Sequence, residues 1–406
     1  MNTDQHQIKT ASFASFVPFL ILISFFSLLN TFVRTIFSPL VPYICQDLQL
    51  CHADAGNLFF ILSIGFALTL FGSQFLSVKI SHKMTLVLSL MTTGLALILT
   101  SFALDFTTLR FGMFLLGLSS GFFIPSAVAT IREVVSNKHL GKAFGIFGSA
   151  QSVAFILSSL VVQFCIYSMS WQAILRGTGA VSLLVTALAI FCFKQGASRG
   201  EAVSMVFART LFGSPSFWII LVLLCLANGL NVGIYNMAPD YFQCHNLIQG
   251  SEVSRLIEWA RALSIGTAIL AGVFADRFGL KRSIFAALII CGIVTSLMGL
   301  VAPSFSLFLF CFQSPIAACL MPLVHFAMAT IVPVEKNASL ISLMAPFAFL
   351  AGAGIVPQIL GFFGDSNLYA EGFVIFGMIA MISGVCFNSS SVYRQVEISQ
   401  TNSFES

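Results

Sequence analysis

Long apolar segments alternate with short polar ones along almost the whole chain. A helix needs about 20 mostly apolar residues to cross the hydrocarbon core of a bilayer, and segments of that length recur twelve times. Because open strands cannot satisfy their backbone groups in lipid, each segment is expected to be a helix. The pattern predicts an all-α membrane protein with spans at 15–40, 56–78, 84–103, 107–131, 143–167, 172–193, 214–238, 253–275, 283–302, 305–331, 338–362 and 370–391.

The composition agrees with a chain that is mostly embedded in lipid. Hydrophobic residues make up 58% of the chain and charged residues only 8%, whereas soluble domains carry about 25% charged residues. The first apolar segment is too long for the hydrophobic part of a cleaved signal peptide, so we interpret it as a membrane span. The net charge of +4 is too small to indicate a nucleic-acid partner.

Lysine and arginine are distributed asymmetrically between the two sides of the membrane. With an even number of spans, both termini lie on the same side. The basic residues outside the spans all fall on that side, namely Lys9, Lys79, Lys83, Arg132, Lys138, Lys142, Lys194, Arg199, Arg209, Arg277, Lys281, Arg282, Lys336 and Arg394. Because positive charge accumulates in cytoplasmic segments, we expect a multi-pass protein of the inner (plasma) membrane with both termini in the cytoplasm.

The two halves of the chain repeat one another. Arg34 stands eight residues before Pro42, and Asn231 stands eight residues before Pro239, each pair in the first span of its half. The two pairs are 197 residues apart. Two halves inserted the same way up are typical of transporters that bind their substrate between the halves. We expect a six-helix half at 1–193, a cytoplasmic linker at 194–213, a second six-helix half at 214–391 and a disordered cytoplasmic tail at 392–406.

The loop after the eighth expected span carries a sequence motif. From Gly272 to Arg282 it reads GVFADRFGLKR, which resembles the loop signature G-x-x-x-D-R-x-G-x-[KR]-[KR] of the major facilitator superfamily. Together with the two six-helix halves, the resemblance covers essentially the whole chain. It implies a transporter that exposes its substrate site to each side of the membrane in turn. It also implies that the loop steadies one state of this cycle, through Asp276, Arg277, Gly279, Lys281 and Arg282.

Other segments match the family less closely. In the first-half copy of the loop, Val78 and Ser81 stand where the acidic residue and the glycine are expected. The fifth span has Gln151 in the region where drug/proton antiporters of the family carry a Gly-Pro pair. The stretch from Gly352 to Pro357 resembles the matching element of the second half. The altered first-half loop does not argue against the fold. The missing Gly-Pro pair argues against multidrug efflux.

Arg34 lies well inside the first span, one turn after Asn30. Ionisable groups inside a membrane are costly, so each one is a functional hypothesis. An arginine offers a planar, permanently charged donor fork that suits a carboxylate or a phosphate. The Arg-x7-Pro spacing resembles the organophosphate antiporter branch of the family, where this arginine helps to hold the substrate anion. We expect Arg34 and Asn30 to bind substrate; the alternative is that Arg34 extends to the lipid headgroups or pairs with a carbonyl.

The eighth span carries a second group of ionisable residues, Arg255, Glu258 and Arg261. Their spacing puts them along one side of a helix, close enough to pair. Arg261 is a candidate for a second substrate-binding arginine, and Glu258 is a candidate for a proton carrier. The alternative is a structural ion pair near the outer mouth. His325 in the tenth span is the other candidate for proton coupling, with a structural hydrogen bond as its alternative role.

Neutral polar residues complete the candidate site. Asn228, Asn231 and Tyr235 fall on one face of the seventh span, and Asn231 is the repeat partner of Arg34. Gln151 of the fifth span is a further candidate. We expect Asn231, Tyr235 and Gln151 to contact the substrate. The alternative for each is a hydrogen bond between helices, typically worth about 0.6 kcal/mol.

No pattern in the chain indicates catalysis. The sequence shows no catalytic triad, nucleotide-binding loop or metal-ligand spacing, and its ten cysteines form no CxxC pair. His52 and Asp54 fall in an expected outside loop with no catalytic partner in view. Cys45 and Cys51 fall in the same loop, so a disulfide is an alternative to two free thiols. We expect no enzymatic activity, no cofactor and no metal.

The sequence as a whole favours a monomeric secondary carrier in the lipid bilayer. Its expected solute is a small organic anion, moved by facilitation, in exchange for a counter-anion, or together with a proton. The alternative is a multidrug or metabolite efflux carrier coupled to protons. A membrane sensor built on a transporter scaffold is a third hypothesis, which the absence of an obvious output domain disfavours.

Overall fold

The computed structural model describes residues 13–136, 139–192, 196, 198–199, 205–244, 250–331 and 337–389, apart from a few helical side chains. Regular secondary structure in these ranges is entirely helical, which confirms the predicted all-α class. The expected tail at 392–406 lies outside the described residues. The chain divides into two compact units, which we call unit 1 (Met1–Leu48 and Ile61–Ala202) and unit 2 (Gln49–Phe60 and Val203–Ser406).

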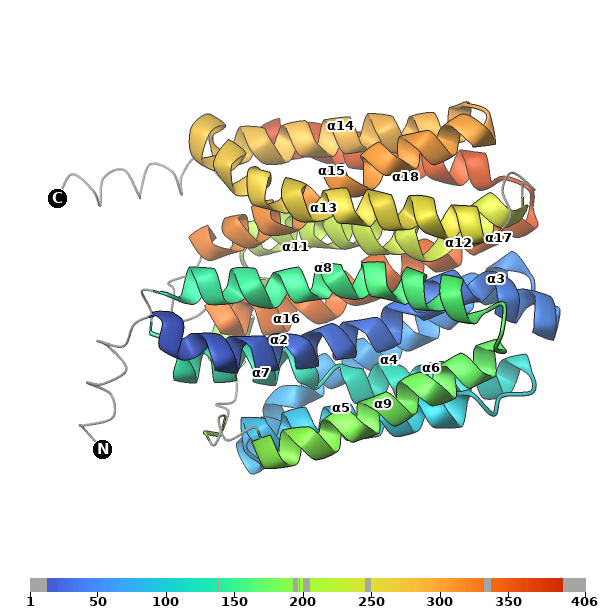
Figure 1. Cartoon of the computed structure of the whole chain (residues 1–406). Helices are drawn as coiled ribbons and strands as arrows, with labels where there is room; N and C mark the ends of the chain where they lie inside the picture. Colours follow the sequence, from blue (N-terminus) through green and yellow to red (C-terminus); the bar gives the residue numbers. More distant parts are fainter. Residues whose placement is uncertain are drawn as a thin grey trace, which may run out of the picture. The chain divides into compact units, whose positions relative to one another are not determined.

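The helices of unit 1 correspond to the first six expected spans. The first span is made of two helices, and so is the fourth. In chain order they are α2 (Phe13–Thr35), α3 (Phe37–Leu48), the later part of α4 (His52–Lys79), α5 (His82–Thr100), α6 (Phe106–Ser120), α7 (Phe123–Val134), α8 (Leu140–Cys165) and α9 (Trp171–Cys192). Within this unit α8 packs along α2, and α5 packs against α6 and α9 (Figure 1).

The helices of unit 2 correspond to the linker and the last six expected spans. They are α10 (Met205–Phe212), α11 (Pro215–Asn228), η2 (Gly229–Gly233), α12 (Ile234–Cys244), α13 (Gly250–Phe278), α14 (Leu280–Leu300), α15 (Pro303–Ile331), α16 (Asn337–Ala348), η4 (Phe349–Ile355), α17 (Val356–Asp365) and α18 (Tyr369–Ser389). In this unit α14 packs along α18, and both α13 and α14 pack along α15 (Figure 1). The first two turns of α4 also belong to unit 2.

Eleven of the described helical segments are long and apolar enough to cross a membrane. They match eleven of the twelve expected spans. The remaining expected span, 253–275, falls on α13, whose apolar described part, Trp259–Ala275, is shorter. One face of α9 illustrates a surface suited to lipid, because it exposes the large apolar side chains of Val181, Leu184, Leu188 and Phe191 at helical spacing.

Two spans are longer in the structure than hydropathy predicts. The first was expected to end at residue 40 but continues to Leu48, and the seventh continues beyond residue 238 to Cys244. Polar side chains near these ends are satisfied by other helices, which a hydropathy pattern cannot reveal. Asp47 accepts hydrogen bonds from Trp171 Nε1 at 2.8 Å and from Gln172 Nε2 at 3.2 Å.

The seventh and eleventh spans each contain a π-helical segment, and the two segments, η2 and η4, pack together in unit 2. Glycines permit this contact. A Cβ on Gly233 would lie 2.4 Å from Gly352 O, and a Cβ on Gly352 would lie 2.4 Å from Asn228 Cβ. The stretch from Gly352 to Pro357, already distinctive in the sequence, therefore begins where the two backbones meet. π-Helical turns are rare and frequently occur at functional sites.

Gly279 alone connects α13 to α14. Its φ of +84° and ψ of 143° define a conformation that is essentially restricted to glycine. In the first-half loop the turn is made differently, because the Ser81 hydroxyl caps α5 and accepts a hydrogen bond from Met84 N at 3.4 Å. The first-half loop thus lacks the glycine of the motif because its turn is made by a serine cap instead.

We expect Gly279→Ala to destabilise the protein by about 1–3 kcal/mol, because a side chain is strained in this backbone conformation. The loss should appear as a lower apparent Tm in detergent solution. Gly272→Ala is the matched control, since a Cβ at either glycine meets nothing within 4 Å and only Gly279 has a positive φ. Equal effects of the two substitutions would contradict the strain argument.

The expected linker at 194–213 contains ordered structure. Its last part forms α10, which belongs to unit 2. Earlier in the segment, the Gly196 and Ser198 carbonyls accept hydrogen bonds from Lys83 N at 2.8 Å and from His82 N at 3.1 Å. These contacts fasten the linker to the beginning of α5, within unit 1.

Candidate functional site

In unit 1, two neighbouring groups contact the guanidinium of Arg34 near the end of α2. Its Nε donates a hydrogen bond to Asn30 O, one turn earlier, at 3.3 Å. Its Cζ lies 4.4 Å from the centre of the Phe66 ring of α4, a distance at which the ring face attracts a cation. The structure therefore places Asn30 and Arg34 side by side and adds Phe66, which no sequence pattern indicated.

Asn30 is buried between α2 and α6. Its Nδ2 donates to Ser120 O at 3.3 Å. Its Oδ1 is also buried, and it accepts no hydrogen bond from any described residue. Because a buried acceptor without a partner is costly, this oxygen can accept a hydrogen bond from a hydroxyl or amide group of a bound molecule. We call Asn30, Arg34 and Phe66 the Arg34 cluster.

In unit 2, Arg261 of α13 is buried, with only 4% of its surface exposed. Its Nη1 donates to Asn231 Oδ1 at 2.6 Å, and its Nη2 donates to Asn231 O. Its Cζ lies 4.2 Å from the centre of the Tyr235 ring. Arg261 and the two candidates from the seventh span, Asn231 and Tyr235, thus form one group, which we call the Arg261 cluster.

The π-helical turn explains why backbone carbonyls are available to this cluster. In an α-helix each carbonyl accepts from the N–H group four residues later. Here the Ile234 N–H group bonds instead to Gly229 O, five residues earlier. Side chains donate to two carbonyls of the widened turn, in the pairs Arg261–Asn231 and, at 3.0 Å, Gln313–Leu230. A backbone carbonyl of the π-helical turn therefore helps to orient the Arg261 guanidinium.

The remaining candidate residues belong to neither the Arg34 cluster nor the Arg261 cluster. Gln151 lies half-buried on α8, which packs along α2, and its amide makes no hydrogen bond within the described part of unit 1. His325 Nδ1 lies 2.7 Å from Met321 O of its own helix, which favours the structural alternative for this residue. The side chains of Glu258 and Asp276 lie outside the described residues. Arg277, Lys281 and Arg282 flank the Gly279 turn.

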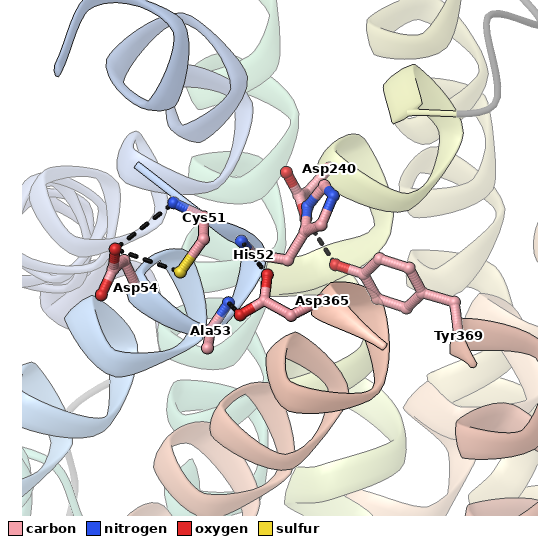
Figure 2. A network of polar contacts seen from close by, with 7 residues as sticks. All are labelled: Cys51, His52, Ala53, Asp54, Asp240, Asp365 and Tyr369. Carbon is pink, nitrogen blue, oxygen red and sulfur yellow. Dashed lines mark hydrogen bonds and ion pairs between the residues drawn. The ribbon is translucent and has the colours of Figure 1, made fainter. Parts of the chain in front are cut away.

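Figure 2 shows a polar network in unit 2 that no sequence pattern predicted. The Asp240 carboxylate of α12, 5% exposed, lies 2.7 Å from His52 Nδ1 and accepts a hydrogen bond from the Tyr369 hydroxyl. Asp240 lies beyond the expected end of the seventh span, and His52 was interpreted as a loop residue without a partner. The pair is separated by 188 positions, so no local sequence pattern could have joined it.

The same network holds the beginning of α4. The Asp365 carboxylate accepts hydrogen bonds from His52 N at 2.7 Å and from Ala53 N at 3.2 Å, so it caps the helix (Figure 2). One turn later, Asn57 Nδ2 donates to Gln358 Oε1 at 2.7 Å. Through these contacts α4 belongs to unit 2 as far as Phe60, whereas its remainder belongs to unit 1.

Cys45 and Cys51 are not joined by a disulfide, so that alternative is not formed. Cys45 lies inside α3, because the first span extends further than expected. The Cys51 thiol donates a hydrogen bond to Asp54 Oδ2 at 3.1 Å. Partial desolvation, together with this hydrogen bond, raises the pKa of the Cys51 thiol to about 11.

We expect Cys51 to be alkylated by maleimide about tenfold more slowly than an ordinary exposed thiol at about pH 8. The raised pKa leaves less thiolate, and the higher nucleophilicity of that thiolate offsets part of the loss. Asp54→Ala removes the hydrogen bond but not the desolvation, so it should restore the rate in part, measured by mass spectrometry of the peptide that contains Cys51. The same slow rate in wild type and variant would show that Asp54 does not protect the thiol.

Several solved transporter structures resemble the chain over nearly its whole length. A bacterial homologue of the human lysosomal transporter Spinster, in an inward-facing and unoccupied conformation, is 14% identical with a TM-score of 0.79; the match covers 95% of this chain and 99% of that chain. A D-xylose–proton symporter is 13% identical with a TM-score of 0.76, over 91% and 96% of the two chains. At such low identity the likeness establishes the fold alone.

A curated relative is the probable 4-methylmuconolactone transporter of Cupriavidus pinatubonensis (strain JMP 134 / LMG 1197). It is 23% identical over 283 residues, which are 66% of this chain. The match spans 64% of that relative, slightly less than two thirds of its length.

Eleven long apolar helical segments among the described residues define a multi-pass membrane protein, and its fold is one that solved transporters share. The family model of the Major Facilitator Superfamily matches residues 23–250, more than half of the chain. The protein belongs to the major facilitator superfamily, as the sequence resemblance predicted, and the Gly272–Arg282 loop lies outside the matched residues. It is therefore a transmembrane transporter and not an enzyme.

Proposed function

We propose that the protein carries a small organic anion across the inner membrane by alternating access, and that Arg34 and Arg261 bind this anion. The observation that carries the proposal is the Arg261 cluster. There, Asn231 and Tyr235 fix the orientation of a buried guanidinium before any solute is bound. A binding group that is already oriented loses little conformational entropy when its ligand arrives.

The choice of an anion follows from the chemistry of arginine. Its guanidinium stays charged at every accessible pH and matches the two oxygens of a carboxylate or phosphate. In a site with little water, the attraction between opposite charges is several times stronger than in bulk solvent. An arginine inside a membrane protein is expensive to bury, so two aromatic-stacked arginines, one in each unit, favour a functional role over a structural one.

The Arg34 cluster likewise offers a guanidinium that lies over an aromatic ring, in this case on α2. Asn30 adds an acceptor, because its buried Oδ1 accepts no hydrogen bond from the described residues. We assign Gln151 of α8 the role of a neutral hydrogen-bonding contact. Together these groups suit an anion that also carries a hydroxyl or another polar substituent.

The curated relative supports an anionic solute. Its name refers to 4-methylmuconolactone, a compound with one carboxylate beside its lactone ring. At 23% identity over part of the chain, the relative supports a class of solute and not a particular compound.

We propose that both termini lie in the cytoplasm and that a monomer suffices for transport. Residues 1–193 and 214–391 would rock against one another, joined by the linker at 194–213. The loop formed by Asp276, Arg277, Gly279, Lys281 and Arg282 would steady one state of this cycle. Glu258 is our candidate for a coupled proton, and exchange for a counter-anion is the alternative to proton coupling.

Uptake by the purified protein in proteoliposomes tests the proposal. The panel contains labelled mono- and dicarboxylates, organophosphates, neutral sugars and lipophilic cations, each measured with and without a pH gradient. We expect saturable uptake of at least one anion class and none of the cations. Anion uptake that ignores the gradient would support facilitation or exchange.

The opposite pattern would overturn the assignment. Uptake confined to lipophilic cations or neutral compounds, and only with a pH gradient, would favour proton-coupled efflux. Glu258 would then be the first residue to replace. Empty liposomes, together with protein in which both arginines are replaced, give the background for each solute.

A further inference from the structure

The ring of His52 lies among carboxylates at the beginning of α4 (Figure 2). On α12, the Asp240 carboxylate is 2.7 Å from its Nδ1. On α17, the Asp365 carboxylate binds the backbone N–H of the same residue. The Tyr369 ring of α18 meets the imidazole edge-on, with 5.5 Å between the ring centres. Three helices of unit 2 therefore meet at one histidine.

Among the described side chains, the charged groups near this histidine are of one sign. Besides Asp240 and Asp365, the first turn of α4 carries Asp54, and the start of α18 carries the exposed Glu371. No lysine or arginine is present in the described parts of α12, α17 and α18. A carboxylate at hydrogen-bond distance attracts an imidazolium much more strongly than a neutral imidazole. Histidine gains or loses this charge between about pH 5 and 8.

We propose that His52 and Asp240 form a proton-binding site whose occupancy holds the first two turns of α4 against α12, α17 and α18. With the proton bound, His52 and Asp240 form an ion pair, to which Tyr369 donates a second hydrogen bond. As the pH rises and the proton leaves, the ion pair becomes an ordinary hydrogen bond. The hold on α4 then weakens, although the Asp365 cap remains.

The position of the site gives it a mechanical consequence. α4 is one continuous helix, of which the part up to Phe60 belongs to unit 2 and the part from Ile61 to unit 1. A change in how tightly its first two turns are held therefore acts on a helix that both units share. In the proposed orientation His52 faces the outside, so the site responds to external pH. This response does not depend on which solute the protein carries.

Hydrogen exchange of the full-length protein in lipid nanodiscs, without solute, tests the proposal. Backbone exchange in peptides covering residues 52–60 is measured at about pH 6 and about pH 8, the range in which histidine titrates, and is corrected for the chemical exchange rate. We expect these amides in the wild type to be about tenfold better protected at the lower pH. This factor corresponds to the net free energy of about one charge-assisted hydrogen bond. No pH difference in the wild type would overturn the proposal.

Two substitutions of His52 separate its charge from its shape. His52→Gln is neutral throughout and should lose the pH difference, with weak protection at both values. His52→Lys is charged throughout and should also lose the difference, while keeping more protection than the glutamine variant at the higher pH. A pH difference that persists in His52→Gln would assign the effect to another group and so overturn the proposal.

Asp240→Asn tests the other half of the pair, and it should abolish the pH difference as His52→Gln does. His139→Gln is the matched control. His139 lies in unit 1 against the Phe13 ring, at 5.5 Å between the ring centres, and its replacement should leave the response unchanged. Unchanged exchange in peptides of α5 and α9 shows in each variant that unit 1 is still folded.

Discussion

Replacing Arg261 by glutamine should lower uptake of the transported anion about 100-fold. Two charge-assisted hydrogen bonds between the guanidinium and the anion are worth about 3 kcal/mol together, and this energy corresponds to a factor of about 100. Arg261→Lys keeps the charge but loses the planar fork, so it should recover only part of the activity. Arg34→Ala should abolish uptake in the same assay while the protein remains inserted.

Arg176→Gln is the matched control for both substitutions. Arg176 is an arginine within a span whose guanidinium also lies over an aromatic ring, Phe102, at 5.8 Å, but its side chain is exposed. Its replacement should leave uptake near the wild-type rate. Normal uptake by the Arg261 and Arg34 variants would remove the anion-binding role of the two clusters. An equal loss in Arg176→Gln would point to a general loss of charge instead.

Gly352→Ala should destabilise the protein by about 3 kcal/mol, the upper end of what overpacking a close contact costs. Its Cβ would lie 2.4 Å from Asn228 Cβ and 2.6 Å from Gly229 N. The second of these is a backbone atom that cannot move without disturbing η2. We expect a fall of the apparent Tm by about 5 °C or more. Transport should fall as well, because η2 carries Asn231, which orients Arg261.

Gly266→Ala provides the comparison for this prediction. It adds the same methyl group to a helix of unit 2, but a Cβ at this position meets nothing within 4 Å. Alanine is the better helix former by up to about 1 kcal/mol, so this variant should be as stable as the wild type or slightly more stable. A Tm for Gly352→Ala equal to that of Gly266→Ala would contradict the packing argument.

Most of the fold could be predicted from sequence because a bilayer imposes a strict length and polarity on each span. The predicted spans failed mainly at their ends. Hydropathy ended the first span at residue 40 and the seventh at residue 238, although both helices continue. In each case the continuation includes a carboxylate, Asp47 or Asp240, that distant side chains satisfy. A polar residue with such partners cannot be distinguished by pattern alone from a loop residue.

The candidate site could be predicted only in part, for the same physical reason. Helical spacing put Asn231 and Tyr235 on one face, and the cost of burying a charge drew attention to Arg261. That these three residues touch depends on the π-helical turn, which follows from packing between Gly233 and Gly352 more than 100 residues apart. The His52–Asp240 pair gave no signal at all, because neither residue lies in a motif and the contact spans 188 positions.

The beginning of α4 is synthesised long before the residues that hold it. His52 precedes Asp240 by 188 residues and Asp365 by 313. At about 5–20 residues per second, a ribosome takes about 10–40 s to reach the first of these partners and about 15–60 s to reach the second. Throughout that interval the nascent first half carries a helix whose first two turns lack their native contacts. The native contacts of α4 are therefore completed only after Asp365, at the end of the eleventh span, has been synthesised, and the membrane's proteases have that long to act on the first half.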